Sequence, residues 1–213
     1  MPSILIPTAL VALADVKAEL PALGADTSQD AYLEGLINSY TLAFESYTRR
    51  KLKSRKYMPT GANLALAEEN LTLNGDDRVS PTEFWLPQWP VTLLSAVTIK
   101  DSQLVTVKTL TLASDVVLDG ETGQMRLIDG DTWERGIQNI LASFTGGYTT
   151  VPQDLVRAFV IQVAWGFYQK DRSRQGMESI SSGSETVTYF TGAILPEVKM
   201  ILNKYQRVLV GRS

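Results

Sequence analysis

The chain has 213 residues, of which 44% are hydrophobic and 20% are charged, and its formal net charge is −3. These proportions are typical of a soluble globular protein, and the length accommodates one large domain or two small ones. The sequence contains no cysteine and no histidine, which excludes disulfides, zinc–thiolate sites, thiol catalysis and histidine general bases. Carboxylate, serine–lysine and tyrosine chemistry stay open, but the composition favours a structural or binding role over an enzyme.

The N-terminal quarter predicts two helices. No basic residue precedes its first apolar run, so we expect that the chain has no signal peptide and is made in the cytoplasm. A short helix is expected from Leu13 to Leu20, ended by Pro21. A longer helix is expected from about Gln29 to about Leu52, because its apolar residues recur at three- and four-residue steps.

The longer helix is predicted to end in a basic run with six basic residues in eight positions. They are Arg49, Arg50, Lys51, Lys53, Arg55 and Lys56. One interpretation is a patch that contacts DNA phosphates or an acidic partner protein. The other is that cations suit the C-terminal end of a helix and solvate an ordinary surface.

Residues 57–148 have the character of strands and turns. Short apolar or alternating segments predict strands at Leu94–Lys100, Val105–Leu112, Val116–Leu118, Gln124–Ile128 and Ile140–Thr145. The Asn74-Gly75 pair predicts a hairpin turn, and the aromatic segment from Phe84 to Val91, which contains two prolines, fits a sheet edge. Together these features indicate an antiparallel β-sandwich or small barrel.

A broadly apolar helix is predicted after Pro152, running to about Asp171. A surface helix needs only one apolar stripe, whereas this helix is apolar on most sides and should be buried on more than one face. We therefore expect Phe159 or Trp165 at a subunit interface. The charges at both ends leave too short an uncharged run for a membrane span. A serine- and glycine-rich stretch, Ser173 to Val187, then predicts a mobile docking loop; its candidate contacts are Ser173, Gly176, Met177, Ile180, Ser182 and Gly183. A last helix opens at Leu195-Pro196-Glu197.

No catalytic or cofactor-binding constellation emerges from the motifs. The acidic turns at Asp76-Asp77, Asp119–Glu121 and Asp129–Asp131 could supply calcium ligands or a carboxylate pair, but they lack the spacing of a calcium loop. Trp85 and Trp89 could form a stacking surface for sugars or bases; packing in the core or at an interface is the alternative reading. No cofactor or metal is therefore expected.

The order of these segments resembles the head–tail connector (adaptor) proteins of tailed bacteriophages. The segments that carry the resemblance are Tyr47–Arg50, Trp89–Val91 followed by Ser95–Val97, Thr145–Tyr148 with Val151-Pro152, the helix ending at Phe167–Arg172, and Tyr205–Arg207. The β-region is longer than in the smallest members of that family, so the chain looks like a version with an inserted β-domain.

The resemblance implies a non-enzymatic virion protein of the neck, between capsid and tail. It implies a homo-oligomeric ring, usually of twelve copies, which binds the portal protein and a tail or stopper protein. Such a ring extends the DNA channel, and an acidic chain would let DNA slide without gripping it. No membrane partner is expected.

The expected fold class is α+β, with a helical bundle from both chain ends and an inserted antiparallel β-sandwich or small barrel. The expected parts are residues 1–56, 57–148 and 149–213, the last with its mobile loop at 173–187. Two rival functions stay open: a β-rich carbohydrate- or protein-binding module that uses the tryptophans, and a metal-dependent hydrolase that uses the acidic turns.

Overall fold

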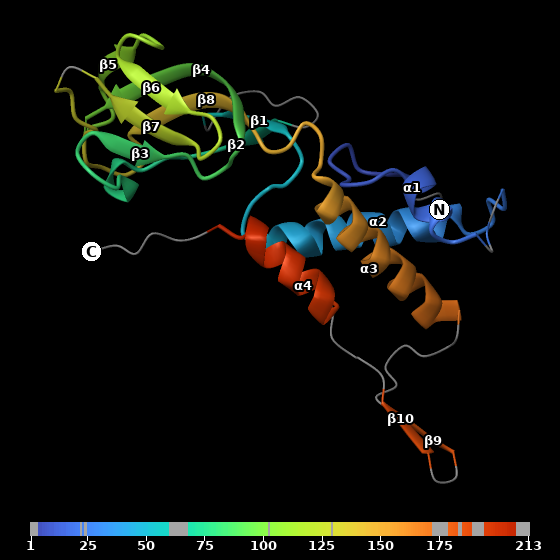
Figure 1. Ribbon diagram of the computed structural model, residues 1–213. Helices are drawn as coiled ribbons and strands as arrows, with labels where there is room; N and C mark the ends of the chain where they lie inside the picture. Colours follow the sequence, from blue (N-terminus) through green and yellow to red (C-terminus); the bar gives the residue numbers. More distant parts are fainter. Residues whose placement is uncertain are drawn as a thin grey trace. The chain divides into compact units, whose positions relative to one another are not determined.

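The computed structural model describes residues 4–21, 23, 25–59, 68–101, 103–128, 130–171, 179–182, 185–188 and 194–207. The fold is α+β, and its sheets are mainly antiparallel. The described residues divide into two compact units. Residues 4–49 and 151–207 form a helical unit, and residues 50–150 form a β unit (Figure 1).

The helical unit is built around the pairing of its two long helices, α2 (Asp30–Thr48) and α3 (Gln153–Asp171). Phe44 of α2 meets Phe159 of α3 edge to face, with ring centroids 5.0 Å apart, and both side chains are fully buried. Tyr40 lies against Gly166, where an added Cβ atom would come within 2.6 Å of the tyrosine hydroxyl oxygen. The absence of a side chain at Gly166 therefore allows the two helices to approach closely.

Shorter segments complete the helical unit on either side of this pair. Helix α1 (Leu13–Ala18) contacts both α2 and α3. Helix α4 (Pro196–Leu202) packs on α3, and the 3-10 turn η2 (Asn203–Tyr205) follows it directly. The side chain of Gln162, fully buried in α3, accepts a hydrogen bond from the backbone N–H of Leu195 at 2.9 Å and so fixes the start of α4.

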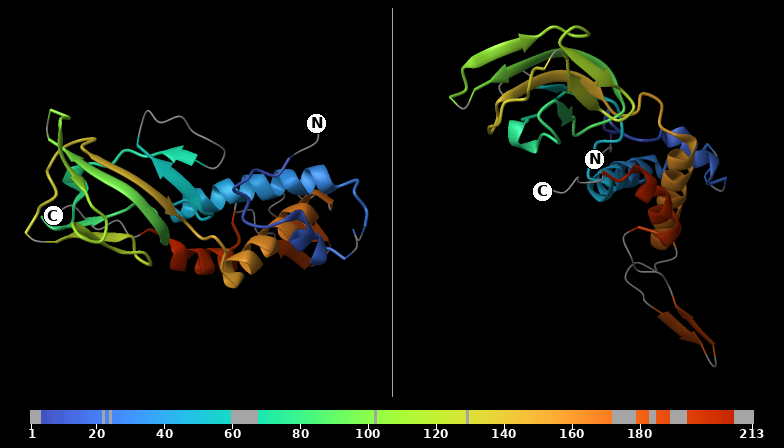
Figure 2. Two further views of the ribbon diagram at one scale, coloured as in Figure 1. Left: turned by 90° about the horizontal axis from the view of Figure 1, so that it is seen from above. Right: turned by 60° about the vertical axis from the view of Figure 1, so that its left-hand side comes forward.

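The β unit contains a five-stranded and a three-stranded sheet (Figures 1 and 2). The larger sheet has the order β2-β1-β8-β4-β5 and the smaller the order β3-β7-β6. All pairings are antiparallel except that of β1 with β2. The strands are β1 (Arg55–Met58), β2 (Glu68–Asn70), β3 (Glu83–Trp85), β4 (Val91–Lys100), β5 (Thr106–Leu110), β6 (Val116–Asp119), β7 (Gln124–Leu127) and β8 (Ile140–Gly146).

One hydrophobic core is formed by residues from both sheets of the β unit. It takes alternate residues from β8, whose burial alternates strictly along the strand, and fully buried residues from β7 and from the segment that holds Trp133. Fully buried Asn139 ties three backbone segments together beside this core: it accepts from Gly75 N–H at 2.7 Å and donates to the carbonyls of Glu134 and Lys100 at 3.0 and 3.3 Å. These bonds satisfy backbone groups that the sheets leave unpaired.

Several elements differ from the expectation drawn from the sequence. Helix α2 ends at Thr48, because Arg49 adopts a left-handed conformation (φ 56°) that terminates the helix. The Asn74-Gly75 pair leads into the 3-10 turn η1 (Gly75–Asp77) and makes no hairpin. Within the serine-rich stretch, β9 (Ser179–Ser182) pairs with β10 (Glu185–Thr188) in antiparallel register. Among the described residues, no helix is long and apolar enough to cross a membrane.

Candidate functional site

The six cations of the predicted basic patch do not form one exposed surface. Arg49 belongs to the helical unit and the other five to the β unit. Arg50 and Arg55 are buried, with 3% and 7% of their surface exposed, so neither is available to contact DNA or a partner. The Arg55 guanidinium pairs with Glu69 on β2, and Lys56 pairs with Glu68 at 3.0 Å. Only Arg49 and Lys56 are well exposed, and Lys51 and Lys53 are half-buried.

Arg50 packs against aromatic side chains at the edge of the β unit. Its guanidinium lies 4.2 Å from the ring centroid of Trp89 and 5.3 Å from that of Tyr148, and it donates a hydrogen bond to the Trp89 carbonyl. The adjacent Lys51 N–H donates to the Gln88 side chain at 2.8 Å. A cation that lies over aromatic rings is stabilised by their electron-rich faces and retains its hydrogen bond. The two ends of the β unit, near residues 50 and 148, are thereby joined.

Two of the three acidic turns are closed by their own hydrogen bonds; in the third, Asp129 lies outside the described residues and Asp131 pairs with Lys108. Asp119 accepts from the Thr122 hydroxyl at 2.7 Å and from Glu121 N–H at 3.0 Å, and these bonds lower the pKa of its carboxyl group. Asp77 accepts from the Asn74 side chain at 3.1 Å. No group of three or more acidic side chains among the described residues could hold a metal ion. These carboxylates organise turns, as Asx side chains commonly do.

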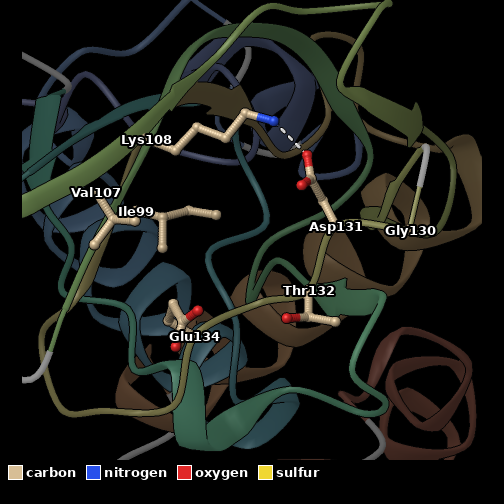
Figure 3. Close-up of a pocket in the computed structure, with 7 residues that line it drawn as sticks. All are labelled: Ile99, Val107, Lys108, Gly130, Asp131, Thr132 and Glu134. Atoms are coloured by element: carbon tan, nitrogen blue, oxygen red, sulfur yellow. Dashed lines mark hydrogen bonds and ion pairs between the residues drawn. The ribbon is translucent and has the colours of Figure 1, made fainter.

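A shallow pocket opens between β4, β5 and the segment that follows β7 (Figure 3). Its volume is about 200 Å³, and its lining residues are Ile99, Val107, Lys108, Gly130, Asp131, Thr132 and Glu134. Lys108 and Asp131 form an ion pair across it, with 40% of each side chain exposed. Lys108 and Asp131 therefore compensate each other's charge, and the side chains of Thr132 and Glu134 also line the pocket.

The two tryptophans that the sequence grouped together have different environments. Trp89 stacks on Arg50, whereas 40% of the Trp85 surface is exposed on β3. The register of the smaller sheet places Trp85 opposite Gln124, and Gln124 opposite Asp119, in one row across its outer face. A flat aromatic ring beside amide and carboxylate groups is a surface that can stack on and hydrogen-bond to a polar ligand.

The residues expected at a subunit interface are also separated by the structure. Phe159 is fully buried against Phe44 of its own chain, so it presents no surface to a neighbour. Trp165 is half-buried, and its interface role stays a prediction. Of the loop candidates, Ser173, Gly176, Met177 and Gly183 lie outside the described residues, and Ile180 and Ser182 lie in β9. Their role in docking also stays a prediction.

Sequence reasoning missed the apolar side chains that the helical unit does expose. Leu42 on α2 is 57% exposed, and Ile161 and Tyr168 on α3 are 37% and 38% exposed. The spacing of Ile161, Trp165 and Tyr168 places all three on one side of α3. The sequence shows this spacing. Because the helix is apolar on most sides, the spacing alone could not distinguish an exposed stripe from the buried face.

Comparison with known proteins shows similarity at the level of the fold. No protein-family model and no curated protein matches the chain. Among solved structures, the chain is similar to one described as the neck of an empty gene transfer agent particle computed with C6 symmetry, with 19% identity and a TM-score of 0.59. It is also similar to a chain of the virion of the native gene transfer agent (18%, TM-score 0.57) and to one of the neck of the native particle computed with C12 symmetry (20%, TM-score 0.52). Each alignment covers 100% of this chain and 98% of the other chain. At such identities the similarity concerns the fold, and this chain shares that fold over its whole length.

Proposed function

We propose that this chain is a structural protein of the neck of a phage-like particle. The observation that carries the proposal is the similarity of the complete chain, helical unit and β unit together, to chains of gene transfer agent necks and virions. A match to one common domain would say little about function. A match over 100% of this chain and 98% of the other includes both units in the same order along the chain.

In the proposed particle the chain forms a homo-oligomeric ring, with twelve copies, between the portal protein and a tail or stopper protein. The C6 and C12 symmetries named for the similar necks support a ring. The net charge of −3 favours a channel through which DNA slides, because like charges weaken binding to phosphates. The protein acts without catalysis; its lack of histidine and cysteine supports this part of the proposal.

Only four of the six candidate cations are left for contact with the portal, the tail or DNA. They are Arg49, Lys51, Lys53 and Lys56. Arg49 is the strongest of these, because it is exposed and its left-handed backbone holds it beyond the end of α2. Lys56 already has an acidic partner in Glu68, so its charge is partly compensated.

Removal of the chain from a particle-producing strain tests the proposal. We expect capsids and tails that are each complete but fail to join, with packaged DNA lost from the capsids, and expression of the chain in trans should restore joined particles. Electron microscopy and a DNA-protection assay provide the readout. Joined, DNA-filled particles in the absence of the chain would refute a neck role.

Exposed Trp85 favours a second candidate function, the binding of a carbohydrate by the outer face of the smaller sheet. A glycan-binding screen of the whole protein tests it, with Trp85→Ala as the variant and Val117→Ala, on the same face, as the control. Binding that is lost only in the Trp85 variant would support this candidate. Absence of any bound glycan would remove it and leave the neck proposal unaffected.

A further inference from the structure

Two surfaces that contain exposed apolar side chains lie on opposite sides of the α2–α3 pair. The first, the α3 stripe, consists of Ile161, Trp165 and Tyr168. The second, the α2 face, consists of Leu42 with its exposed neighbours Ser39 and Ser46. Leu42 is 57% exposed, Ile161 and Tyr168 are 37% and 38% exposed, and Trp165 between them is half-buried.

The opposite orientation of these surfaces follows from the contact between Phe44 and Phe159. Leu42 stands two residues before Phe44, and Ile161 stands two residues after Phe159. Since successive residues of an α-helix are rotated by about 100°, each exposed side chain points about 160° away from the phenylalanine of its own helix. The two phenylalanines face each other, so Leu42 points away from α3 and Ile161 points away from α2.

Their composition makes the two surfaces suitable partners for each other. No charged residue lies between Ser39 and Ser46 on the α2 face except Glu45, which is buried with 4% exposed. No charged residue lies between Ile161 and Tyr168. One surface carries large aromatic groups and the other carries small serines beside one leucine, so ridges on the first can enter grooves on the second.

We infer that the α3 stripe of one copy packs against the α2 face of a second copy of this chain. A contact between two different surfaces is heterologous, and repetition of such a contact generates a closed ring when the rotation between copies closes. Two patches on opposite sides of each copy meet that requirement, whereas one self-complementary patch would stop at a dimer. The inference rests on the proposed ring and names the surfaces that close it.

Thiol cross-linking in the assembled protein tests the inference, because the chain has no cysteine of its own. Three variants are needed: Leu42→Cys, Ile161→Cys and the double variant. Each is incorporated into particles, treated with a short bifunctional thiol reagent and separated under denaturing conditions. The double variant should give a ladder of linked multimers, and each single variant should stay monomeric, because residue 42 faces residue 161 and not itself.

Controls and contrary outcomes separate this inference from the neck proposal. The pair Leu42→Cys with Val117→Cys, whose valine is exposed on β6, should give no ladder. Particles that contain the chain but yield no ladder from the double variant would overturn the inference and leave the neck role standing. Dimers from a single variant would overturn it as well, because they indicate an isologous contact. A chain absent from particles would refute the neck role itself, and the inferred contact with it.

A mixing experiment with purified protein provides an independent check. Ile161→Arg and Leu42→Arg each place a charge in one half of the contact while the other half stays intact. Each variant alone should associate at least tenfold more weakly than the wild type, with an unchanged melting temperature because both sites are exposed. A mixture of the two should form heterodimers, because the intact α2 face of one variant can bind the intact α3 stripe of the other. Larger assemblies should not form, since the remaining two surfaces each carry an arginine. Equal association of wild type and variants would overturn the inference.

Discussion

At the scale of single residues, Arg50 shows how burial changes the role of a cation. Its sequence context, between Arg49 and Lys51, predicts a solvated basic patch. In the fold it is stacked on Trp89 and Tyr148 and is almost completely shielded from water. A guanidinium in that position stabilises the β unit through ring contacts and a hydrogen bond to a backbone carbonyl.

We therefore expect Arg50→Ala to lower the free energy of unfolding of the β unit by about 3 kcal/mol, because a charged hydrogen bond and buried packing are both lost. Arg50→Lys should restore less than half of this, since an ammonium group cannot stack as a planar guanidinium does. Urea unfolding followed by tryptophan fluorescence measures both effects. Arg49→Ala is the matched control and should change the stability by less than about 0.5 kcal/mol. Equal effects at the two positions would contradict the anchoring role of Arg50.

At the scale of elements, the segment after α4 is tied to the ends of both long helices. Tyr205 donates its hydroxyl hydrogen to the Asp154 carboxylate at the start of α3, and Lys204 Nζ lies 3.7 Å from the same group. Tyr47 of α2 donates to Asn203 at 2.8 Å, and Arg207 N–H donates to the Thr48 carbonyl at 2.9 Å. Polar contacts close to solvent hold this segment, so its docking should respond to pH.

The pKa of Asp154 is lowered, first by the Tyr205 hydroxyl and further by Leu155 N–H and the Lys204 charge. A carboxyl group with a lowered folded-state pKa stabilises the fold above its unfolded value of about 3.8 and loses that contribution as the pH falls through the folded pKa. We expect amide exchange at Tyr205–Arg207, compared with the intrinsic rate, to become less protected as the pH drops below about 4. In Tyr205→Phe the pKa of Asp154 should rise towards its ordinary value, as an NMR titration would show.

The control for this prediction is Tyr168→Phe, which changes an exposed tyrosine of the same helix and should leave the Asp154 titration unaffected. An unchanged Asp154 pKa in Tyr205→Phe would show that the hydroxyl does not stabilise the carboxylate. The protection should then follow only the general acid unfolding of the chain.

At the scale of the whole molecule, local patterns predicted element types well and long-range partners poorly. Alternation along Ile140–Thr145 identified β8, and the apolar recurrence after Pro152 identified α3. Strand β1 was missed because Arg55 and Lys56 hide the alternation of its buried and exposed residues. The burial of Arg55 depends on Glu69, 14 residues away, and that of Arg50 on Trp89, 39 residues away. Local spacing does not reveal such pairings, so the candidate site was predicted less well than the fold.

The boundary of the β unit illustrates the same limit. The sequence placed it at residues 57–148, where strand-like residues begin and end. The structure places it at residues 50–150, because buried Arg50, Leu52 and Arg55 belong to the β unit. Leu52 and Ser54 also bond to Tyr148: Tyr148 N–H donates to the Leu52 carbonyl at 2.8 Å, and Ser54 N–H donates to the Tyr148 carbonyl at 3.0 Å. The two ends of the unit are therefore hydrogen-bonded to each other.

We expect a fragment of residues 50–150 to fold on its own, since it is one continuous segment with its own hydrophobic core. Circular dichroism should show β structure and one cooperative thermal transition. A fragment of residues 57–148 is the matched control; it lacks three buried side chains and the bonds that join the ends, so it should melt more than about 10 °C lower or stay unfolded. Equal melting temperatures would mean that residues 50–56 add nothing to the β unit. An unfolded 50–150 fragment would mean that the β unit needs the helical unit in order to fold.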